Sequence, residues 1–233
     1  MVPRRDGGAA PRPGPVGRVL AALYDLTTAG MERRLFAARR RGLLAAARGR
    51  VLDVAAGTGA NLPHYRWDRV AELVLLDPSA GMLERARRKA SALGRAVRLV
   101  EGPAERLPFD DETFDAVVFT LALCTIPDPA AALREADRVL RPDVLQDEEP
   151  ALRAQDPGLA AWQDRLTPFW RIVGGGCHPN RDTRATIEAA GFRFEAAEEF
   201  LEERIPLPIV RPQLIGAARR AAPPPEKRGA APA

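Results

Sequence analysis

Residues 51–59 read Val-Leu-Asp-Val-Ala-Ala-Gly-Thr-Gly, an apolar stretch that runs directly into a turn containing two glycines. Residues 73–77 follow as Leu-Val-Leu-Leu-Asp, a second apolar stretch that ends on an acid. Gly57 and Gly59 permit positive φ angles and a close approach of the backbone to a ligand. An acid at the end of the second strand, here Asp77, is placed to accept hydrogen bonds from a ribose. The ordered pattern predicts a nucleotide-type ligand at the carboxyl edge of a parallel sheet.

The start of this turn differs from the phosphate-binding turn of dinucleotide enzymes. Ala55 stands where the first glycine of a G-x-G-x-x-G fingerprint would be. Asp53 lies inside the motif, where a carboxylate suits a cationic ligand and would repel a pyrophosphate. A helix-capping or strand-end role is the alternative for Asp53. The pattern Asp-x-Ala-x-Gly-x-Gly resembles motif I of the class I S-adenosylmethionine methyltransferases, whose ligand carries a sulfonium cation, an amino-acid end and an adenosine.

Length and composition are typical of one α/β domain. The chain has 233 residues, of which 46% are hydrophobic and 28% charged. Apolar runs stay well below the roughly 18 residues of a membrane span, and the amino terminus lacks the apolar region of a signal peptide. Two cysteines do not make a disulfide framework, so a cytoplasmic location is expected. Cys177 and His178 are adjacent, and Cys124 and His64 are too far away in sequence for zinc-type spacing, so no metal site is predicted.

A basic segment precedes the first strand. Residues 31–50 contain seven arginines and one acid, and leucines recur at helical spacing through the same stretch. The pattern predicts an amphipathic basic helix that is either a solvated flank of the core or a surface for anionic lipid or an acidic substrate. Peripheral membrane contact is therefore an open alternative. Nucleic-acid binding is not expected, because aromatics are only 6% of the chain and none interleaves with these arginines. An obligate protein partner is not indicated either.

The order of elements along the chain predicts a Rossmann-like, doubly wound and mostly parallel sheet. Residues 1–15 and 219–233 are rich in Pro, Gly, Ala and Arg, which predicts disordered tails around a domain at 16–218. Within that domain apolar strand patterns alternate with helical ones. Strands are expected at 51–54, 73–76, 97–100 and 115–120, and helices near 60–66, at 79–93 and at 128–140.

The third expected strand leads into Glu-Gly-Pro-Ala-Glu-Arg-Leu-Pro-Phe at residues 101–109. Together with motif I and Asp77, this loop closely resembles the methyltransferase group that includes the ubiquinone/menaquinone C-methyltransferases. The resemblance implies that the loop covers the adenine, with Ala104 and Glu105 beside it. Pro103 stands where that group usually has an Asp.

The same resemblance implies S-adenosylmethionine as the cofactor, with Thr120 and Leu121 facing its methionine half. The residues predicted to bind the cofactor are Asp53, Ala55, Gly57, Gly59, Asn61, Asp77, Pro78, Met82, Ala104, Glu105, Thr120 and Leu121.

A narrower resemblance covers residues 120–126, 133–142, 175–181 and 206–212, which look like the methyltransferase-like thiol methyltransferases of animals and their bacterial relatives. It implies methyl transfer to a small apolar acceptor, possibly a thiol. A lipid, a quinol precursor or a phenol is the alternative acceptor. His178 is the candidate catalytic residue, as a base or as a group that orients the acceptor.

Three aromatic residues, Trp162, Phe169 and Trp170, share the predicted helix 159–173. They belong either to the core or to an apolar acceptor pocket, and we favour the pocket.

One segment departs from the family pattern. After Pro142 the family continues with two glycines and a buried strand of about seven apolar residues, whereas residues 143–150 here contain two apolar residues and four acids. Buried carboxylates are costly, so a loop or at most a short irregular strand is expected, with the fifth strand missing or irregular. This departure leaves a second class of function open, a module that binds S-adenosylmethionine with impaired catalysis.

Overall fold

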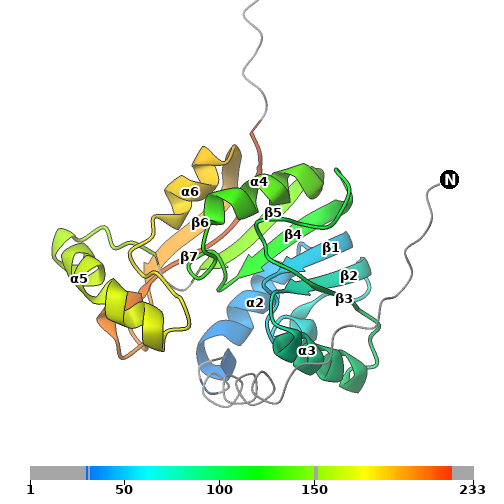
Figure 1. Ribbon diagram of the computed structural model, residues 1–233, viewed down its shortest axis with the longest axis horizontal. Helices are drawn as coiled ribbons and strands as arrows, with labels where there is room; N and C mark the ends of the chain where they lie inside the picture. Colours follow the sequence, from blue (N-terminus) through cyan, green and yellow to red (C-terminus); the bar gives the residue numbers. More distant parts are fainter. Residues whose placement is uncertain (1–29, 31, 150–151, 222–233) are drawn as a thin grey trace, which may run out of the picture.

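A single seven-stranded sheet organises the computed structural model, which describes residues 30, 32–149 and 152–221 (Figure 1). The strand order is β3-β2-β1-β4-β5-β7-β6. The first five strands in this order are parallel, and β7 runs antiparallel to both β5 and β6. The prediction of a Rossmann-like, mostly parallel sheet is confirmed. The strands are β1 (Gly49–Val54), β2 (Val70–Asp77), β3 (Arg98–Glu101), β4 (Phe114–Thr120), β5 (Leu140–Glu149), β6 (Phe192–Leu201) and β7 (Pro212–Arg220).

The helices begin where the sequence supplies capping side chains. Each of the last four α-helices follows a Ser or Asp whose side chain accepts the backbone N–H three residues later. The predicted helices 79–93 and 128–140 are confirmed as α3 and α4. The predicted helix near 60–66 is only the 3₁₀ turn η2, and Pro63 within it lacks the N–H that a longer helix would use. The helical segments are η1 (Glu32–Phe36), α2 (Ala37–Leu44), η2 (Leu62–His64), α3 (Ala80–Ala92), α4 (Pro129–Val139), α5 (Pro157–Val173), α6 (Thr183–Ala189) and η3 (Pro208–Val210).

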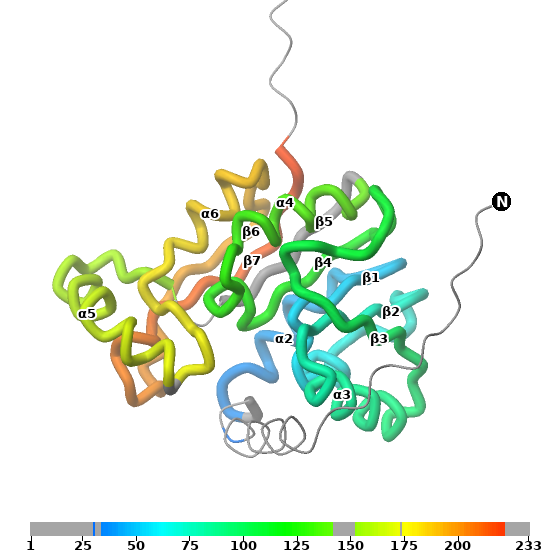
Figure 2. The backbone as a smooth tube through the Cα atoms, in the orientation of Figure 1, coloured from blue at the N-terminus to red at the C-terminus, as the bar shows by residue number. Residues whose placement is uncertain are grey.

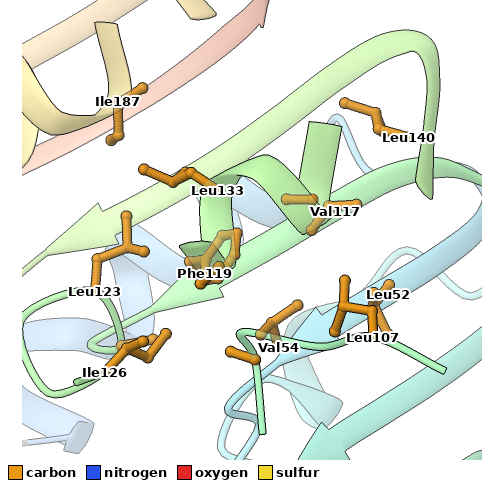
Figure 3. Close-up of a cluster of buried hydrophobic side chains, with 14 of the residues drawn as sticks. Leu52, Val54, Leu107, Val117, Phe119, Leu123, Ile126, Leu133, Leu140 and Ile187 are labelled. Carbon is orange, nitrogen blue, oxygen red and sulfur yellow. The ribbon is translucent and has the colours of Figure 1, made fainter. Parts of the chain in front are cut away.

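Two apolar clusters, one on each side of the sheet, form the core. Side chains alternate along a strand, so Leu52 and Val54 of β1 join one cluster while Val51 joins the other. Figure 3 shows the first cluster, in which Phe119 of β4 and Leu133 of α4 are fully buried. That cluster also includes residues of α6, and the second includes residues of α2 and α3. Helices therefore cover both faces, as a doubly wound sheet requires.

The segment predicted to be a loop is a strand. Strand β5 pairs in parallel with residues 116–120 of β4 and antiparallel with residues 214–219 of β7. The prediction of a missing fifth strand is therefore wrong, and the only register shift in the β4–β5 pairing lies near its start, between Phe114 and Ala116. The reason lies in the backbone. A strand here finds partners for its N–H and C=O groups on both sides, whereas a loop would leave edges of β4 and β7 unpaired.

The predicted basic helix over 31–50 is shorter than expected. Helical structure covers residues 32–44, and β1 begins at Gly49. None of the helices in the described ranges is both long and apolar enough to cross a membrane.

The two predicted tails lie largely beyond the described residues. The segment 1–15 falls wholly outside them. Strand β7 continues through Arg220, so the domain extends past the predicted boundary at 218, and residues 222–233 again lie outside the described part.

Candidate functional site

A buried polar cluster lies near the ends of β1 and β4. The fully buried Asp53 accepts hydrogen bonds at Oδ2 from Asn61 Nδ2 (2.9 Å) and from the Tyr65 hydroxyl (3.0 Å). Asn61 Nδ2 also donates to Thr120 Oγ1 (2.8 Å), at the last residue of β4. Within the described chain, Asp53 Oδ1 is buried without a hydrogen-bond partner. The fold thus brings three predicted cofactor residues into one network and leaves one strong acceptor in it unused.

Arg40 is a member of this cluster that the sequence reasoning missed. Its side chain is 3% exposed, and its Nη1 donates to Asn61 Oδ1 over 2.5 Å. This bond directs the other end of the Asn61 amide, the Nδ2 group, toward Asp53. A signal was present in the sequence, because Arg40 lies four residues after Phe36 and four before Leu44, on the apolar side of the helix. The neighbouring Arg39 also faces inward, where it forms an ion pair with the buried Glu202.

Burial sets the electrostatics of the two acids in this region. It raises the pKa of Asp53 from 3.8 to about 6, even though hydrogen bonds from Asn61 and Tyr65 and the charge of Arg40 act in the opposite direction. Burial also raises the pKa of Asp77, against the hydrogen bonds that it accepts from backbone N–H groups. A cationic group placed against Asp53 would favour its ionised form.

The glycine turn is tied to the end of β2. The Gly57 N–H donates to Asp77 Oδ2 (2.9 Å), and the Ser79 N–H donates to Oδ1 (2.8 Å). Each carboxylate oxygen keeps a further lone pair that could accept a ribose hydroxyl. Gly57 has a φ of +56°, and a Cβ built there meets no atom within 4 Å, so open space lies above the turn.

Gly59 serves the packing under the turn. Its φ is +75°, and a Cβ built on it would lie 2.6 Å from Leu62 Cδ1 and 3.1 Å from the Cβ of Ala86 in α3. The two glycines thus have separate roles, one beneath open space and one at a close contact between the turn and a helix.

Four further predicted cofactor residues lie in the segments that follow β1, β2 and β4. Ala55 and Leu121 both have positive φ angles, of 55° and 57°. Pro78 is exposed at the end of β2, and Met82 is half-buried in the first turn of α3.

The predicted adenine loop lies next to β2, because the Gly102 N–H donates to the Asp77 carbonyl (3.2 Å). Glu105 accepts a hydrogen bond from the Asp128 N–H (3.3 Å). Ala104 is buried in the core cluster, so its side chain takes part in core packing.

His178 lies against the loop that follows β4. It belongs to the segment between α5 and α6, which Figure 2 traces. Its backbone N–H donates to the Cys124 carbonyl (2.8 Å), and its Nδ1 is 3.2 Å from the same oxygen. A carbonyl only accepts, so Nδ1 carries the proton and Nε2 of the neutral ring remains a proton acceptor. Burial, helped by the charge of Arg181, holds the pKa of His178 below its usual 6.5. Arg181 itself donates to the Leu123 and Ile126 carbonyls and so ties the segment after α5 to the loop that follows β4.

A small apolar cluster adjoins His178. Cys124 and Cys177 are buried, and Trp170 and Val210 pack against them. The interpretation of three aromatics as one pocket is wrong for two of them. Trp162 and Phe169 are 56% and 66% exposed, because their helix positions face away from the sheet.

No group of three or more His, Cys, Asp or Glu side chains in the described ranges could hold a metal ion.

The chain is similar to known proteins. A family model described as a methyltransferase domain matches residues 52–145. The human thiol S-methyltransferase TMT1B is 33% identical over 177 residues, which cover 72% of this chain and 69% of the human protein. The chain belongs to the S-adenosylmethionine-dependent methyltransferase family. The cofactor of this family is S-adenosylmethionine.

Other curated relatives match over shorter shares of their length, and a solved structure matches over nearly all of its own. The rat thiol S-methyltransferase TMT1B is also 33% identical, over 61% of this chain and 59% of its own, so the chain spans less than two thirds of that protein. The demethylmenaquinone methyltransferase of Mycolicibacterium gilvum is 39% identical over 127 residues, 53% of each protein. A solved S-adenosylmethionine-dependent methyltransferase from Methanosarcina mazei has a TM-score of 0.60 at 17% identity and covers 77% of this chain and 96% of that one. This last likeness shows the shared fold.

Proposed function

We propose that this protein transfers the methyl group of S-adenosylmethionine to a small apolar acceptor, and that a thiol is the favoured acceptor. The observation that carries the proposal is the unused, fully buried Asp53 Oδ1 beside the open glycine turn. A buried carboxylate oxygen without a partner is costly unless a ligand supplies one. The ammonium group of the cofactor's methionine half has the chemistry that it requires.

The residues present fit this cofactor from one end to the other. Asp53 and Thr120 would hold the methionine half, and Asp77 would accept from the ribose hydroxyls. The space above Gly57 would admit the ligand close to the backbone. When bound, S-adenosylmethionine supplies a methyl group activated by a positive sulfonium, so the protein mainly has to align the acceptor and exclude water.

His178 is placed to manage the acceptor's proton. The lowered pKa keeps its ring neutral at neutral pH, and the Cys124 carbonyl holds the Nδ1 proton, so Nε2 would take the proton of a thiol. The bound cofactor would supply the activated methyl group, which the thiolate sulfur would accept as the sulfonium C–S bond leaves its electron pair on the departing sulfur. A thiolate is the reactive form in such a displacement.

Similarity supports two kinds of acceptor to different extents. The thiol methyltransferase match extends over 72% of the chain and supports a thiol acceptor. The demethylmenaquinone methyltransferase match covers 53% and supports a quinol-type or phenolic acceptor as the second candidate. The alternative of a module with impaired catalysis was favoured by a missing fifth strand and by the basic helix, and the strand is present.

A screen with radiolabelled S-adenosylmethionine tests the proposal. Small alkyl and aryl thiols, phenols and quinol precursors are each incubated with the full chain, and labelled product is counted. We expect turnover with thiols above that with phenols and quinol precursors. Turnover confined to quinol precursors would support the second candidate. Absence of product from every acceptor, with intact cofactor binding, would contradict methyl transfer.

Replacement of His178 tests the proton step. His178→Ala should lower turnover by about 10²-fold or more, because positioned general bases contribute factors of that size. The acidic limb of the rate profile, which in the parent lies below pH 6.5, should disappear in the variant. Calorimetry with S-adenosylmethionine is the control, since cofactor affinity should not change. Normal turnover would leave His178 with a purely structural role.

A further inference from the structure

Exposed apolar side chains concentrate at one end of the molecule. Of the six large apolar side chains exposed in the described part of the chain, three lie on α5: Trp162 (56%), Phe169 (66%) and Ile172 (80%). Leu201 and Leu207 belong to the neighbouring segment that leads into η3, which contacts α5. An exposed apolar patch that gathers on one surface marks an interaction site.

The outward orientation of α5 is fixed by its inner face. Residues three and seven apart share a helix face, and Trp162, Phe169 and Ile172 follow this spacing. The opposite face carries the fully buried Gln163, whose side chain accepts from the Ala154 N–H and donates to the Leu152 and Ile209 carbonyls. Trp162, Phe169 and Ile172 form the apolar stripe of α5. A rotation of the helix that buried this stripe would break these three hydrogen bonds. In Figure 1 the helix stands at the edge of the molecule, apart from the sheet.

The charge on this stripe is positive. Arg165 lies within it, with its guanidinium carbon 5.9 Å from the centre of the Trp162 ring. Asp164 lies on the flank and is already bound by Arg153 (2.8 Å) and Asn180 (2.9 Å). Arg171 is exposed on the same flank as Asp164, seven residues further along the helix. Tryptophan and other large apolar side chains, combined with arginines on a helix, are typical of helices that lie in a membrane interface.

We propose that the outward face of α5, with Leu201 and Leu207, rests on an anionic lipid surface. The apolar side chains would enter the acyl boundary, and Arg165 and Arg171 would meet lipid phosphates. A second copy of the chain fits less well. A two-fold contact through the stripe would bury Arg165 against an apolar face without an acid to pair with it.

The inner face of α5 connects this surface to the candidate acceptor region beside His178, a link that rests on the proposed function. Trp170 packs with Cys124 and Cys177 beside His178. An apolar acceptor dissolved in the bilayer would thus reach the candidate acceptor region by passing one helix.

Vesicle co-sedimentation tests the surface directly. The full chain is mixed with vesicles of phosphatidylcholine alone or of phosphatidylcholine with phosphatidylglycerol, at low and at high salt. We expect binding to the anionic vesicles that weakens with salt. The triple variant Trp162→Gln, Phe169→Gln, Ile172→Gln should lower the partition coefficient at least about tenfold, because three large side chains lose their burial in lipid. Leu93→Gln, at an exposed leucine on α3, is the matched control and should bind as the parent does.

Three outcomes would overturn the proposal. The parent could fail to bind anionic vesicles, or the triple variant could bind as well as the parent. Sedimentation equilibrium could instead show a dimer that the triple variant abolishes, which would assign the face to a second copy. Cofactor calorimetry on the same variants separates this result from the proposed function, because the affinity for S-adenosylmethionine should be equal in all of them.

Discussion

At the scale of single residues, Asp53 combines complete burial with an oxygen that has no partner in the described structure. Arg40 and Asn61 hold this carboxylate in place from one side, and Tyr65 from the other. A carboxyl group whose pKa is raised by burial and whose oxygen has no hydrogen-bond partner is typical of a binding site, where folding stability is given up for ligand affinity.

The pH dependence of stability should report this cost. The folded state binds the Asp53 proton more tightly than the unfolded chain, so stability falls as pH rises from 3.8 to about 6 and stays reduced above that interval. At about 1.4 kcal/mol per pKa unit, the loss is on the order of 3 kcal/mol. Asp53→Asn should therefore be more stable than the parent at neutral pH, and the difference should shrink toward about pH 4. Urea unfolding across this pH range measures it. A difference that is constant with pH would show that Asp53 does not titrate in this way.

Arg40 and Arg41 offer a matched pair one residue apart. Arg40→Met leaves Asn61 Oδ1 buried without its donor, which should cost about 1–3 kcal/mol of unfolding free energy and weaken cofactor binding. Arg41 is exposed, so Arg41→Met should change stability by less than about 0.5 kcal/mol. Urea unfolding and cofactor calorimetry on both variants give the comparison. Equal effects from the two substitutions would contradict the role assigned to Arg40.

At the scale of elements, β5 is where local composition and topology disagree. Four acids in residues 143–150 argue against a buried strand, yet the backbone pairs with β4 and β7. Amide hydrogen exchange should show residues 144–148 protected to a degree similar to residues 116–120 of β4. The exposed loop residues Asp110 and Asp111 serve as the fast-exchanging reference. Exchange over 144–148 as fast as in that loop would return the segment to the irregular state predicted from its composition.

The contrast between β5 and the other elements explains which parts of the fold could be predicted from the sequence. Strands β1 to β4, α3 and α4 have apolar periodicity and capping residues that act locally, so the sequence predicts them well. The fifth strand depends on neighbours more than sixty residues away in β7, which no local pattern contains. Asp53, Gly57 and Asp77 follow from a compact motif. Arg40 enters the site only through tertiary packing of α2, and for that reason it was missed.

At the scale of the whole molecule, the sheet places two functions at different ends of the fold. The buried polar cluster joins β1, β2 and β4. Helix α5 lies beyond β6 and β7 (Figure 1), and its exposed side chains form the apolar stripe. Ligand binding at the sheet should stabilise the entire domain, because a ligand that binds only the folded state raises its free energy of unfolding.

Thermal unfolding should show this stabilisation. At a concentration about 100 times its Kd, S-adenosylmethionine should add about 2.7 kcal/mol and raise the Tm by roughly 5–11 °C for a chain of this size. Adenosine triphosphate is the control, because Asp53 disfavours a polyphosphate at the turn. An equal rise with both compounds would contradict the selectivity assigned to the turn.

Calorimetry on three proteins tests the central claim, that S-adenosylmethionine binds at the turn 53–59 with Asp77 on its ribose. The parent should bind the cofactor. Asp77→Ala should weaken binding by about 1.5–3 kcal/mol, the range for losing hydrogen bonds to a charged group. Gly57→Val should abolish binding, since its side chain would fill the open space above the turn. Circular dichroism verifies that both variants fold. Unchanged affinity in two folded variants would contradict the site described here.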